Sequence, residues 1–278
     1  MAAGASLATL AVTGLVSLGC WAVAEECAGW HVPQRAGAST APIAETLADA
    51  TADKASLRVA AFNIRRAKGR DGRRDLDRVA DLLRGYDLAF CSELDFETDQ
   101  PARLAETLGL SLLAAPTERE GGRVDFGNAF LTRDADPVMT MPLPFVEGRG
   151  FRNLSIVRVQ PFADSDVTLT ILGTHLASAR KAPEQLEVAL ELFEMLEPPV
   201  VLMGDLNARQ GNERLQQTLA RGDVADCSPG KKTRIDWILL RGGGEVALKD
   251  GGLIENDASD HPVVWAEFIP AEQHVSAD

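Results

Sequence analysis

The sequence is poor in aromatic residues and in positive charge. Phe, Trp and Tyr make up 5% of its 278 residues, with a single tyrosine. So few aromatic side chains argue against a long stacking platform for single-stranded nucleic acid. Lys and Arg number 28 against 41 Asp and Glu, which gives a formal net charge of -13. Long-range electrostatics therefore do not favour a polyanion, and any contact with nucleic acid must be local or helped by a metal ion.

Cysteine is also scarce. The chain has 4 cysteines, and their spacings match no zinc-binding pattern. If the chain is cut after Ala24, at most one internal disulfide can form, and Cys27 with Cys227 is the candidate pair. Cys91 lies inside an apolar run and is expected to be a buried small hydrophobe. The chain is therefore not a disulfide scaffold.

Two common catalytic motifs are missing. There is no Gly-rich loop that ends in Lys-Ser or Lys-Thr, so nucleoside triphosphatase chemistry lacks support. There is no Gly-x-Ser-x-Gly either, which removes the usual signal of a serine hydrolase. A composition of 45% hydrophobic and 25% charged residues is that of a globular protein with a large core. One catalytic domain is the simplest interpretation.

The first residues carry an apolar stretch, Leu7–Leu18, and no charged side chain occurs before Glu25. The stretch is short for a spanning helix, and Ala22-Val23-Ala24 offers a small-x-small cleavage site. We therefore expect a signal peptide over residues 1–24 and a secreted or periplasmic protein. Because no Lys or Arg precedes the stretch, an uncleaved membrane anchor is the alternative. Lipidation at Cys20 ranks last, since Ser17 stands where an aliphatic residue is expected.

The rest of the chain divides into a linker at 25–55, rich in Ala, Thr, Pro and Gly, a body at 56–270 and a tail at 271–278. Apolar runs typical of strands recur in the body, at 57–62, 88–91, 128–131, 154–159, 167–172, 200–203, 235–240 and 263–268. Helical spacing occurs near 76–83 and 186–193. Several strands follow each other without a helix between them, which favours a mixed-sheet α/β body over a fully parallel one.

Polar residues follow several apolar runs abruptly. Asn63, Glu93 and His175 each come at the end of a run, and so do Asp205 and Asn207. Strand ends can hold such side chains in a common cleft. Each residue alone is better explained as a loop or capping residue, so only the set indicates a site.

Asp236 and His261 are a second anomaly. Asp236 is embedded in the apolar run 235–240, where an ionised carboxylate is costly without a partner. A lone histidine is usually structural or exposed. A histidine polarised by such a carboxylate, however, would suit acid-base chemistry near neutral pH.

The remaining candidates offer oxygen. Glu93, Asp205, Asn207 and Asp260 supply only oxygen ligands, which favours Mg²⁺, Mn²⁺ or Ca²⁺ over zinc. Mg²⁺ fits best, because it is often held by one or two carboxylates while water and substrate phosphate complete the octahedron.

An ordered set of motifs resembles the endonuclease/exonuclease/phosphatase superfamily, the DNase I-like metal-dependent phosphohydrolases. The motifs are Ala61-Phe62-Asn63-Ile64-Arg65, Ser92-Glu93-Leu94-Asp95, Gly127-Asn128-Ala129-Phe130-Leu131-Thr132-Arg133, Gly173-Thr174-His175-Leu176, Gly204-Asp205-Leu206-Asn207-Ala208, Arg234-Ile235-Asp236-Trp237-Ile238 and Ser259-Asp260-His261. Each motif is weak, but the order is specific and covers the whole body. The resemblance implies a four-layer α/β sandwich, with two mixed β-sheets packed face to face and flanking helices.

The resemblance also implies a metal site and a water-orienting group. Glu93 would be the principal metal ligand, with Asn63 beside it and Asp260 at the metal or hydrogen-bonded nearby. Asp205 and Asn207 would orient the attacking water and the phosphate.

The histidines complete the implied site. His261, paired with Asp236, would deprotonate the water, while His175 would stabilise the phosphorane oxygens or assist the leaving group. Asn128 would support the site. The implied reaction is in-line attack of water on phosphorus, with metal and histidine cations neutralising the developing charge.

Basic residues that could select the substrate cluster just after Asn63. Residues 65–78 hold seven of them, against three aspartates: Arg65, Arg66, Lys68, Arg70, Arg73, Arg74 and Arg78. They could form a positive lip along a phosphate backbone, with Arg65 as a contact, or a solvated face with internal ion pairs. Arg149 and Arg152 are further candidate phosphate contacts.

The sequence leaves the phosphate ester open. A nucleic-acid phosphodiester, possibly DNA, is preferred because no aromatic-rich insertion for lipid binding is evident. A phospholipid, as in sphingomyelinases, or an inositol phosphate is the alternative within the enzyme class. A non-catalytic binding module on the same fold is the alternative of another class, and the intact set of site residues opposes it. No protein partner is implied, and we expect a monomer.

Overall fold

The computed structural model describes residues 55–119, 123–148, 151–163 and 165–271. The expected signal segment, Cys27, Arg149 and all but the last residue of the expected linker lie outside these ranges. Among the described residues, none of the helices has the length and hydropathy that a membrane span requires.

The described residues form twelve strands in two mixed sheets. The first sheet has the order β11-β12-β1-β2-β4-β3 and the second has the order β5-β6-β7-β8-β10-β9. The strands of the first sheet are β1 (Leu57–Asn63), β2 (Leu88–Asp95), β3 (Ser111–Arg119), β4 (Arg123–Thr132), β11 (Val246–Ile254) and β12 (Val263–Pro270). Those of the second are β5 (Asp136–Pro142), β6 (Asn153–Val159), β7 (Leu169–His175), β8 (Val200–Asp205), β9 (Ala225–Asp226) and β10 (Asp236–Arg241). Each sheet has one parallel pair, β1 with β2 and β7 with β8.

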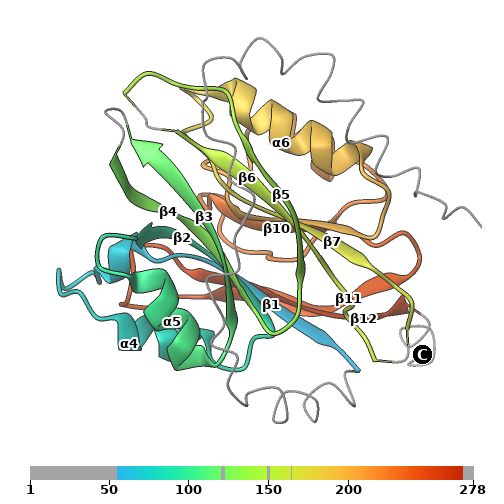
Figure 1. Ribbon diagram of the computed structural model, residues 1–278. Coiled ribbons are helices and arrows are strands. Elements are labelled where there is room, and N and C mark those ends of the chain that lie inside the picture. Colours follow the sequence, from blue (N-terminus) through green and yellow to red (C-terminus); the bar gives the residue numbers. More distant parts are fainter. Residues whose placement is uncertain (1–54, 120–122, 149–150, 164, 272–278) are drawn as a thin grey trace, which may run out of the picture. The chain divides into compact units, whose positions relative to one another are not determined.

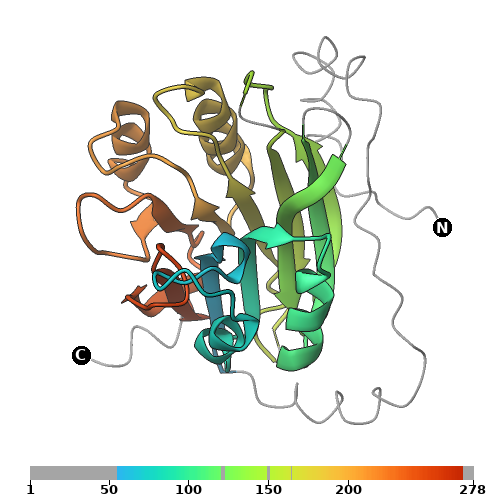
Figure 2. The ribbon, with the colours of Figure 1, turned by 90° about the vertical axis from the view of Figure 1, so that its left-hand side faces the viewer.

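Helices cover the outer faces of the sheets. They are α4 (Leu76–Leu83) and α5 (Gln100–Leu108) on the first sheet, and α6 (Pro183–Met195) and α7 (Glu213–Leu219) on the second, as Figures 1 and 2 show. A short 3-10 turn, η1 (Arg65–Ala67), follows β1. The layers therefore run helices, sheet, sheet, helices, and the four-layer sandwich that the motifs imply is confirmed.

The period of two in the strands produces these layers. Val59 and Ala61 of β1 face the core between the sheets, while Ala60 and Phe62 pack under α4 and α5. A third apolar cluster, which includes Trp237, packs the second sheet against α6 and α7. Burying alternate side chains on the two faces of both sheets is what holds four layers together.

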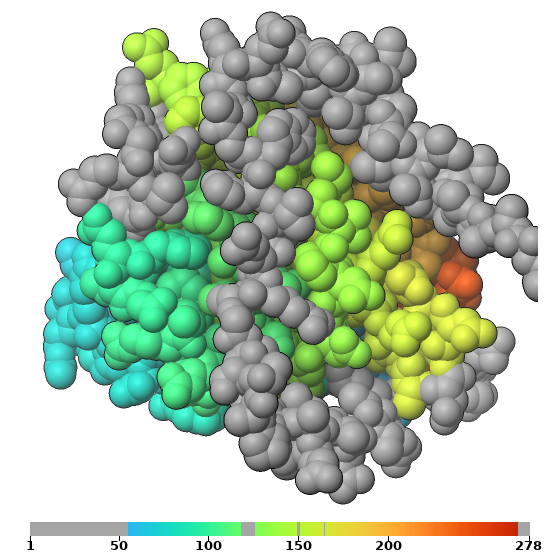
Figure 3. Space-filling model, viewed as in Figure 1, coloured from blue at the N-terminus to red at the C-terminus, as the bar shows by residue number. Residues whose placement is uncertain are grey.

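Eight strands and two helices agree with the apolar patterns, but three long strands do not. β3, β5 and β11 give no clear apolar run, and all three lie at sheet edges, where burial is one-sided. Figure 3 shows the face on which β3 (green) and β5 (yellow-green) lie. Proline also interrupts β3 and β5, and Gly251 and Gly252 interrupt β11. Gly251 is required there, because a Cβ atom would lie 2.0 Å from the Cys227 carbonyl oxygen.

The two described cysteines are buried inside the body. Cys91 is buried as expected, and burial raises the pKa of its thiol to about 12. Cys227 is also fully buried, and its thiol contacts the Ala225 carbonyl at 3.7 Å. Both thiols are free, so neither is a reactive surface nucleophile.

Candidate active site

The site lies where strands from both sheets end together. In the first sheet the parallel register places Asn63 beside Ser92, the residue before Glu93. In the second sheet it places His175 beside Asp205, and β10 places Asp236 directly opposite Asp205. The carboxyl ends of four strands therefore meet the amino end of a fifth, which explains why polar residues interrupt apolar runs at these points.

Asn63 joins the two sheets. Its amide nitrogen donates to Glu93 Oε1 at 3.2 Å and to Asp205 Oδ2 at 3.1 Å. Its Oδ1 accepts from the backbone N–H of Arg65 at 3.1 Å. Because its N–H group faces the carboxylates, Asn63 orients them in this structure and turns its oxygen toward η1.

Glu93 is aimed by a bulge. The pairing of β2 with β4 shifts register between Cys91 and Leu94, and Glu93 has a φ of 58°. A non-glycine residue in the left-handed region costs energy, and such strain concentrates at functional sites. The bulge turns the Glu93 side chain toward Asn63 and leaves it partly exposed, so it can receive a ligand.

Asp205 is the most connected acid of the site. Its Oδ1 accepts from the backbone N–H of Asn207 at 2.9 Å, and its Oδ2 lies 3.5 Å from His175 Nε2. Burial, with the charge of Asp236 opposite, raises the pKa of Asp205 to about 7. Burial likewise raises the pKa of Asp236. Two carboxyl groups are thus held close together in a buried part of the site.

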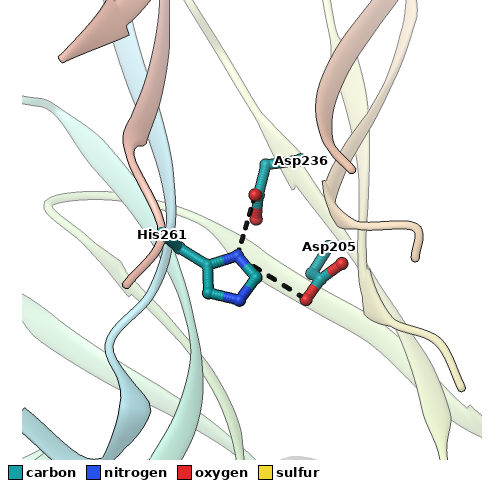
Figure 4. Close-up of side chains that lie close together, drawn as sticks. All are labelled: Asp205, Asp236 and His261. Atoms are coloured by element: carbon teal, nitrogen blue, oxygen red, sulfur yellow. Dashed lines mark hydrogen bonds and ion pairs between the residues drawn. The ribbon is translucent and has the colours of Figure 1, made fainter. Parts of the chain in front are cut away.

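His261 reaches these acids from the other sheet. Its Nδ1 lies 2.9 Å from Asp236 Oδ2 and 3.9 Å from Asp205 Oδ2, as Figure 4 shows. Burial alone would lower the pKa of His261, but the hydrogen bond and charge of Asp236, with Asp205 and Asp260, raise it to about 9. The Asp236 and His261 pair that the motifs imply therefore exists as a contact between the sheets.

Ser259 fixes the loop that carries His261. Its hydroxyl donates to the Asn63 carbonyl at 2.7 Å and accepts from the backbone N–H of His261 at 3.2 Å. The sequence places Ser259 in a motif but gives it no role. The two hydrogen bonds of Ser259 attach the His261 loop to the end of β1, so they fix His261 and Asn63 relative to each other.

His175 is buried and faces Arg152. Arg152 Nη1 lies 3.1 Å from His175 Nδ1, and the guanidinium stacks over the Phe126 ring, 5.8 Å from its centroid. Burial, with the positive charges of Arg152 and His261, holds the pKa of His175 well below 6.5. The structure thus places Arg152, a candidate phosphate contact, against His175.

Asn128 lies deeper than the acids. Its amide donates to Asn153 Oδ1 at 3.0 Å, and Asn153 in turn donates to the carbonyls of Ala115 and Pro116 at 3.2 Å. The Asn153 carbonyl accepts from the Thr174 hydroxyl at 2.8 Å. Asn128 therefore supports the site indirectly, because it bonds the start of β6 to the first sheet, and β6 pairs with β7, which ends at His175. Asn153 was not predicted, although it directly follows Arg152.

Asn207, Asp260 and Arg65 lie around the acids. Asn207 has a φ of 48° and donates its amide to the Leu176 carbonyl at 2.8 Å. Asp260 is half exposed and lies 3.4 Å from the guanidinium of Arg65. Arg65 thus sits at the rim, bound to an acid of the site.

Most of the basic segment at 65–78 is engaged in ion pairs. Arg70 pairs with Glu255, Arg74 pairs with Asp95, and Arg78 pairs with Asp71 and Asp75, at 2.9 to 3.3 Å. Lys68 and Arg73 are exposed. The segment therefore resembles the ion-paired face more than a continuous positive lip.

The acids suit a hard divalent cation. One ligand atom from each of Asp205, Asp236 and His261 lies within 4.8 Å of the others. The His261 Nδ1, however, is hydrogen-bonded to Asp236 Oδ2 and is not free to bind metal. Asp205 and the more exposed Glu93, both linked to Asn63, are the better ligands, because hard cations prefer carboxylate oxygen. The carboxylate oxygens of Asp205 and Glu93 fit such an ion.

Comparisons with known proteins agree with this architecture. The model of the Endonuclease/Exonuclease/phosphatase family matches residues 60–261. A family protein from Beutenbergia cavernae is 22% identical, with a TM-score of 0.61 over 77% of this chain and 72% of that one. A mannosyl-6-phosphatase from Bacteroides thetaiotaomicron is 19% identical, with a TM-score of 0.59 over 77% and 99%. The human Nocturnin catalytic domain is 15% identical, with a TM-score of 0.58 over 77% and 93%. No curated protein matches the chain. At these identities the similar structures show the fold.

Proposed function

The chain belongs to the endonuclease/exonuclease/phosphatase family, and from that premise we propose that it is an exported, metal-dependent phosphodiesterase that cuts nucleic acid. Members of the family are typically divalent-metal-dependent hydrolases of phosphate esters. The observation that carries the proposal is the seam between the sheets, where oxygen donors, a buried Asp–His pair and a second buried histidine converge.

The residues divide the chemistry between them. Asp236 holds the His261 ring through Nδ1, which leaves Nε2 to accept the proton of the attacking water. Asp205, fixed by Asn63 and by the Asn207 backbone, orients that water. His175, whose Nε2 lies 3.5 Å from Asp205 Oδ2, would donate a hydrogen bond to a phosphoryl oxygen.

Glu93 and Asp205, oriented by Asn63, would hold the metal ion. A bound divalent cation polarises the phosphoryl oxygens and neutralises charge that develops on them. Mg²⁺ is our choice among hard cations, because few protein oxygens converge and water with substrate would complete its coordination.

Nucleic acid is our first choice of substrate for two reasons. Arg65 at the rim and Arg152 beside His175 bring positive charge to the site of an acidic protein. Exposed large apolar side chains are few among the described residues: Val138, Phe145 and Met195. That is less apolar surface than a lipid-binding edge would need.

The decisive experiment is a hydrolysis assay of the full chain with Mg²⁺ on plasmid DNA, sphingomyelin vesicles and small phosphomonoesters. We expect cutting of DNA, its loss with chelator, and a drop of about 10²- to 10⁴-fold in His261→Ala. Glu93→Gln should weaken Mg²⁺ binding by at least about tenfold in calorimetry. Glu106→Gln, an exposed acid on α5, is the matched control.

Each outcome has a defined meaning. Hydrolysis of sphingomyelin or of monoesters alone would replace the proposed substrate but keep the reaction. Activity that survives chelation would contradict the metal requirement. No hydrolysis of any of the three would refute the proposed enzyme. Signal-dependent release of the protein from cells tests export.

A further inference from the structure

The contact between Arg152 and His175 fixes where the histidine carries its proton. Arg152 Nη1 and His175 Nδ1 are 3.1 Å apart. A guanidinium has five N–H donors and no acceptor, and it does not lose a proton in proteins. The His175 Nδ1 must therefore accept, and an accepting nitrogen carries no hydrogen.

The second ring nitrogen faces acceptors. His175 Nε2 lies 3.5 Å from Asp205 Oδ2 and 4.0 Å from Glu93 Oε1. Because Nδ1 accepts from Arg152, a neutral ring carries its hydrogen on Nε2, and that nitrogen faces oxygen atoms. His175 is 2% exposed, so these neighbours, and not solvent, determine the tautomer of its ring.

Arg152 is itself held in place. Its guanidinium stacks over Phe126, whose ring also lies 6.3 Å from the His175 ring. Its carbonyl accepts from the Leu143 backbone N–H at 2.9 Å. Asn153, the next residue, is bonded to the first sheet and to Thr174. Arg152 and His175 therefore belong to adjacent, cross-bonded strand ends.

We infer that Arg152 is a positioning residue that holds His175 as a neutral Nε2–H donor, and that His175 therefore stabilises the phosphoryl oxygens without acting as the general acid. This inference rests on the proposed function. When the P–O bond breaks, the leaving oxygen keeps the electron pair and takes its proton from water, and the Nε2–H bond stays intact. A neutral ring that gave up this proton would become an imidazolate.

The other histidine has the opposite environment. His261 Nδ1 faces the carboxylate of Asp236, which can accept a proton, whereas His175 Nδ1 faces a cation that can only donate. His175 lies between the guanidinium of Arg152 and the carboxyl groups of Asp205 and Glu93. One histidine is thus suited to take up a proton and the other to remain neutral.

Nuclear magnetic resonance of the nitrogen-15 labelled full chain reads the tautomer directly. Neutral histidine gives two well-separated ring nitrogen signals whose proton couplings identify the tautomer, whereas imidazolium gives two similar ones. We expect the Nε2–H pattern for His175 at pH 7, with His175→Gln identifying the signals. Arg152→Glu supplies an acceptor, so it should move a proton onto Nδ1. Arg180→Glu, an exposed arginine in the loop after β7, should leave the pattern unchanged.

Kinetics of two His175 variants separate a donor from an acid. The amide N–H of glutamine can replace an Nε2–H donor but cannot act as an acid. We expect His175→Gln to keep kcat/KM within about tenfold of the wild type and His175→Ala to lose about 10²- to 10³-fold. Across aryl phosphodiesters of rising leaving-group pKa, the loss in His175→Gln should stay constant. Thermal melts establish that both variants fold.

Several results would overturn the inference. An imidazolium or Nδ1–H pattern for His175 in the wild type would do so, as would an unchanged pattern in Arg152→Glu. A His175→Gln variant as poor as His175→Ala, with a loss that grows with leaving-group pKa, would establish an acid. If the wild type cuts no phosphate ester, the proposed function fails, while the resonance pattern still decides the tautomer.

Discussion

Replacing Asp205 by asparagine should stabilise the metal-free protein at pH 8 while removing its activity. The Asp205 carboxyl group is 2% exposed and lies opposite Asp236. Burial and the Asp236 charge raise its pKa from 3.8 to about 7, so the folded state favours the neutral acid. Asparagine imitates that neutral acid at every pH.

The size of the effect follows from linkage. Because the folded-state pKa exceeds the unfolded-state value, the stability of the neutral form is fully present below pH 3.8 and is lost as the pH rises through about 7. At about 1.4 kcal/mol per pH unit, the free energy of unfolding falls by about 4 kcal/mol by pH 8. The amide brings a second N–H donor that the acid lacks, which costs about 1 kcal/mol if it stays unpaired. We therefore expect Asp205→Asn to be more stable by about 3 kcal/mol.

Urea unfolding of the wild type and of Asp205→Asn in chelator measures the difference between their free energies of unfolding. This difference should shrink by about 2 kcal/mol between pH 8 and pH 5.5. Mg²⁺ should reduce it by stabilising only the wild type. Glu106→Gln removes an exposed acid and should change neither the free energy of unfolding nor its pH dependence. A less stable Asp205→Asn at pH 8, or a difference independent of pH, would refute the reasoning.

Two further substitutions test the backbone at Gly204 and the role of His261 as the general base. Gly204 has a φ of 127°, and a Cβ atom there would lie 2.0 Å from the Thr174 carbonyl oxygen. Gly204→Ala should therefore lower the free energy of unfolding by at least about 3 kcal/mol. Gly211→Ala is the control: its Cβ atom would meet open space, so it should change the free energy of unfolding by less than about 1 kcal/mol. Similar melting temperatures for the two variants would contradict this prediction. The pKa of His261 is raised to about 9, and only its neutral ring can accept a proton. The rate should consequently rise with pH from 6 toward 9, and Asp236→Asn should move this rise to lower pH while reducing the maximum; an unmoved profile would exclude His261 as the base.

Most residues of the candidate site could be singled out from the sequence because they stand at strand ends. A run such as 200–203 that stops at Gly204 and Asp205 marks a buried strand and its functional end at once. Edge strands carry no such signal: β5 is partly exposed and has proline near both ends. Their positions follow only from the sheets that they border.

Contacts between residues that are distant in the sequence could not be predicted from the sequence. Arg152 precedes β6, and it meets His175 only because β6 pairs with β7 in the register Leu154 with Thr174. The ion pairs of the basic segment depend likewise on distant partners, such as Glu255 for Arg70. Residue type predicts a charge, but tertiary pairing decides whether that charge remains available to a substrate.

The topology also makes the protein divisible in an unusual way. β5 to β10 form the second sheet as one continuous stretch, and the first sheet is interrupted by it. Leu57, at the start of β1, is paired with Phe268 in β12, so a short linker could join the two ends of the body. New ends at the exposed Gly243 and Gly244 would then place each sheet on its own segment.

Splitting such a rearranged chain between β4 and β5 would give two fragments with half a site each. One would hold Asn63, Glu93 and His261, and the other His175, Asp205 and Asp236. Neither fragment would contain the Asp236–His261 pair, so phosphate-ester cleavage would report only the moment at which the two sheets meet.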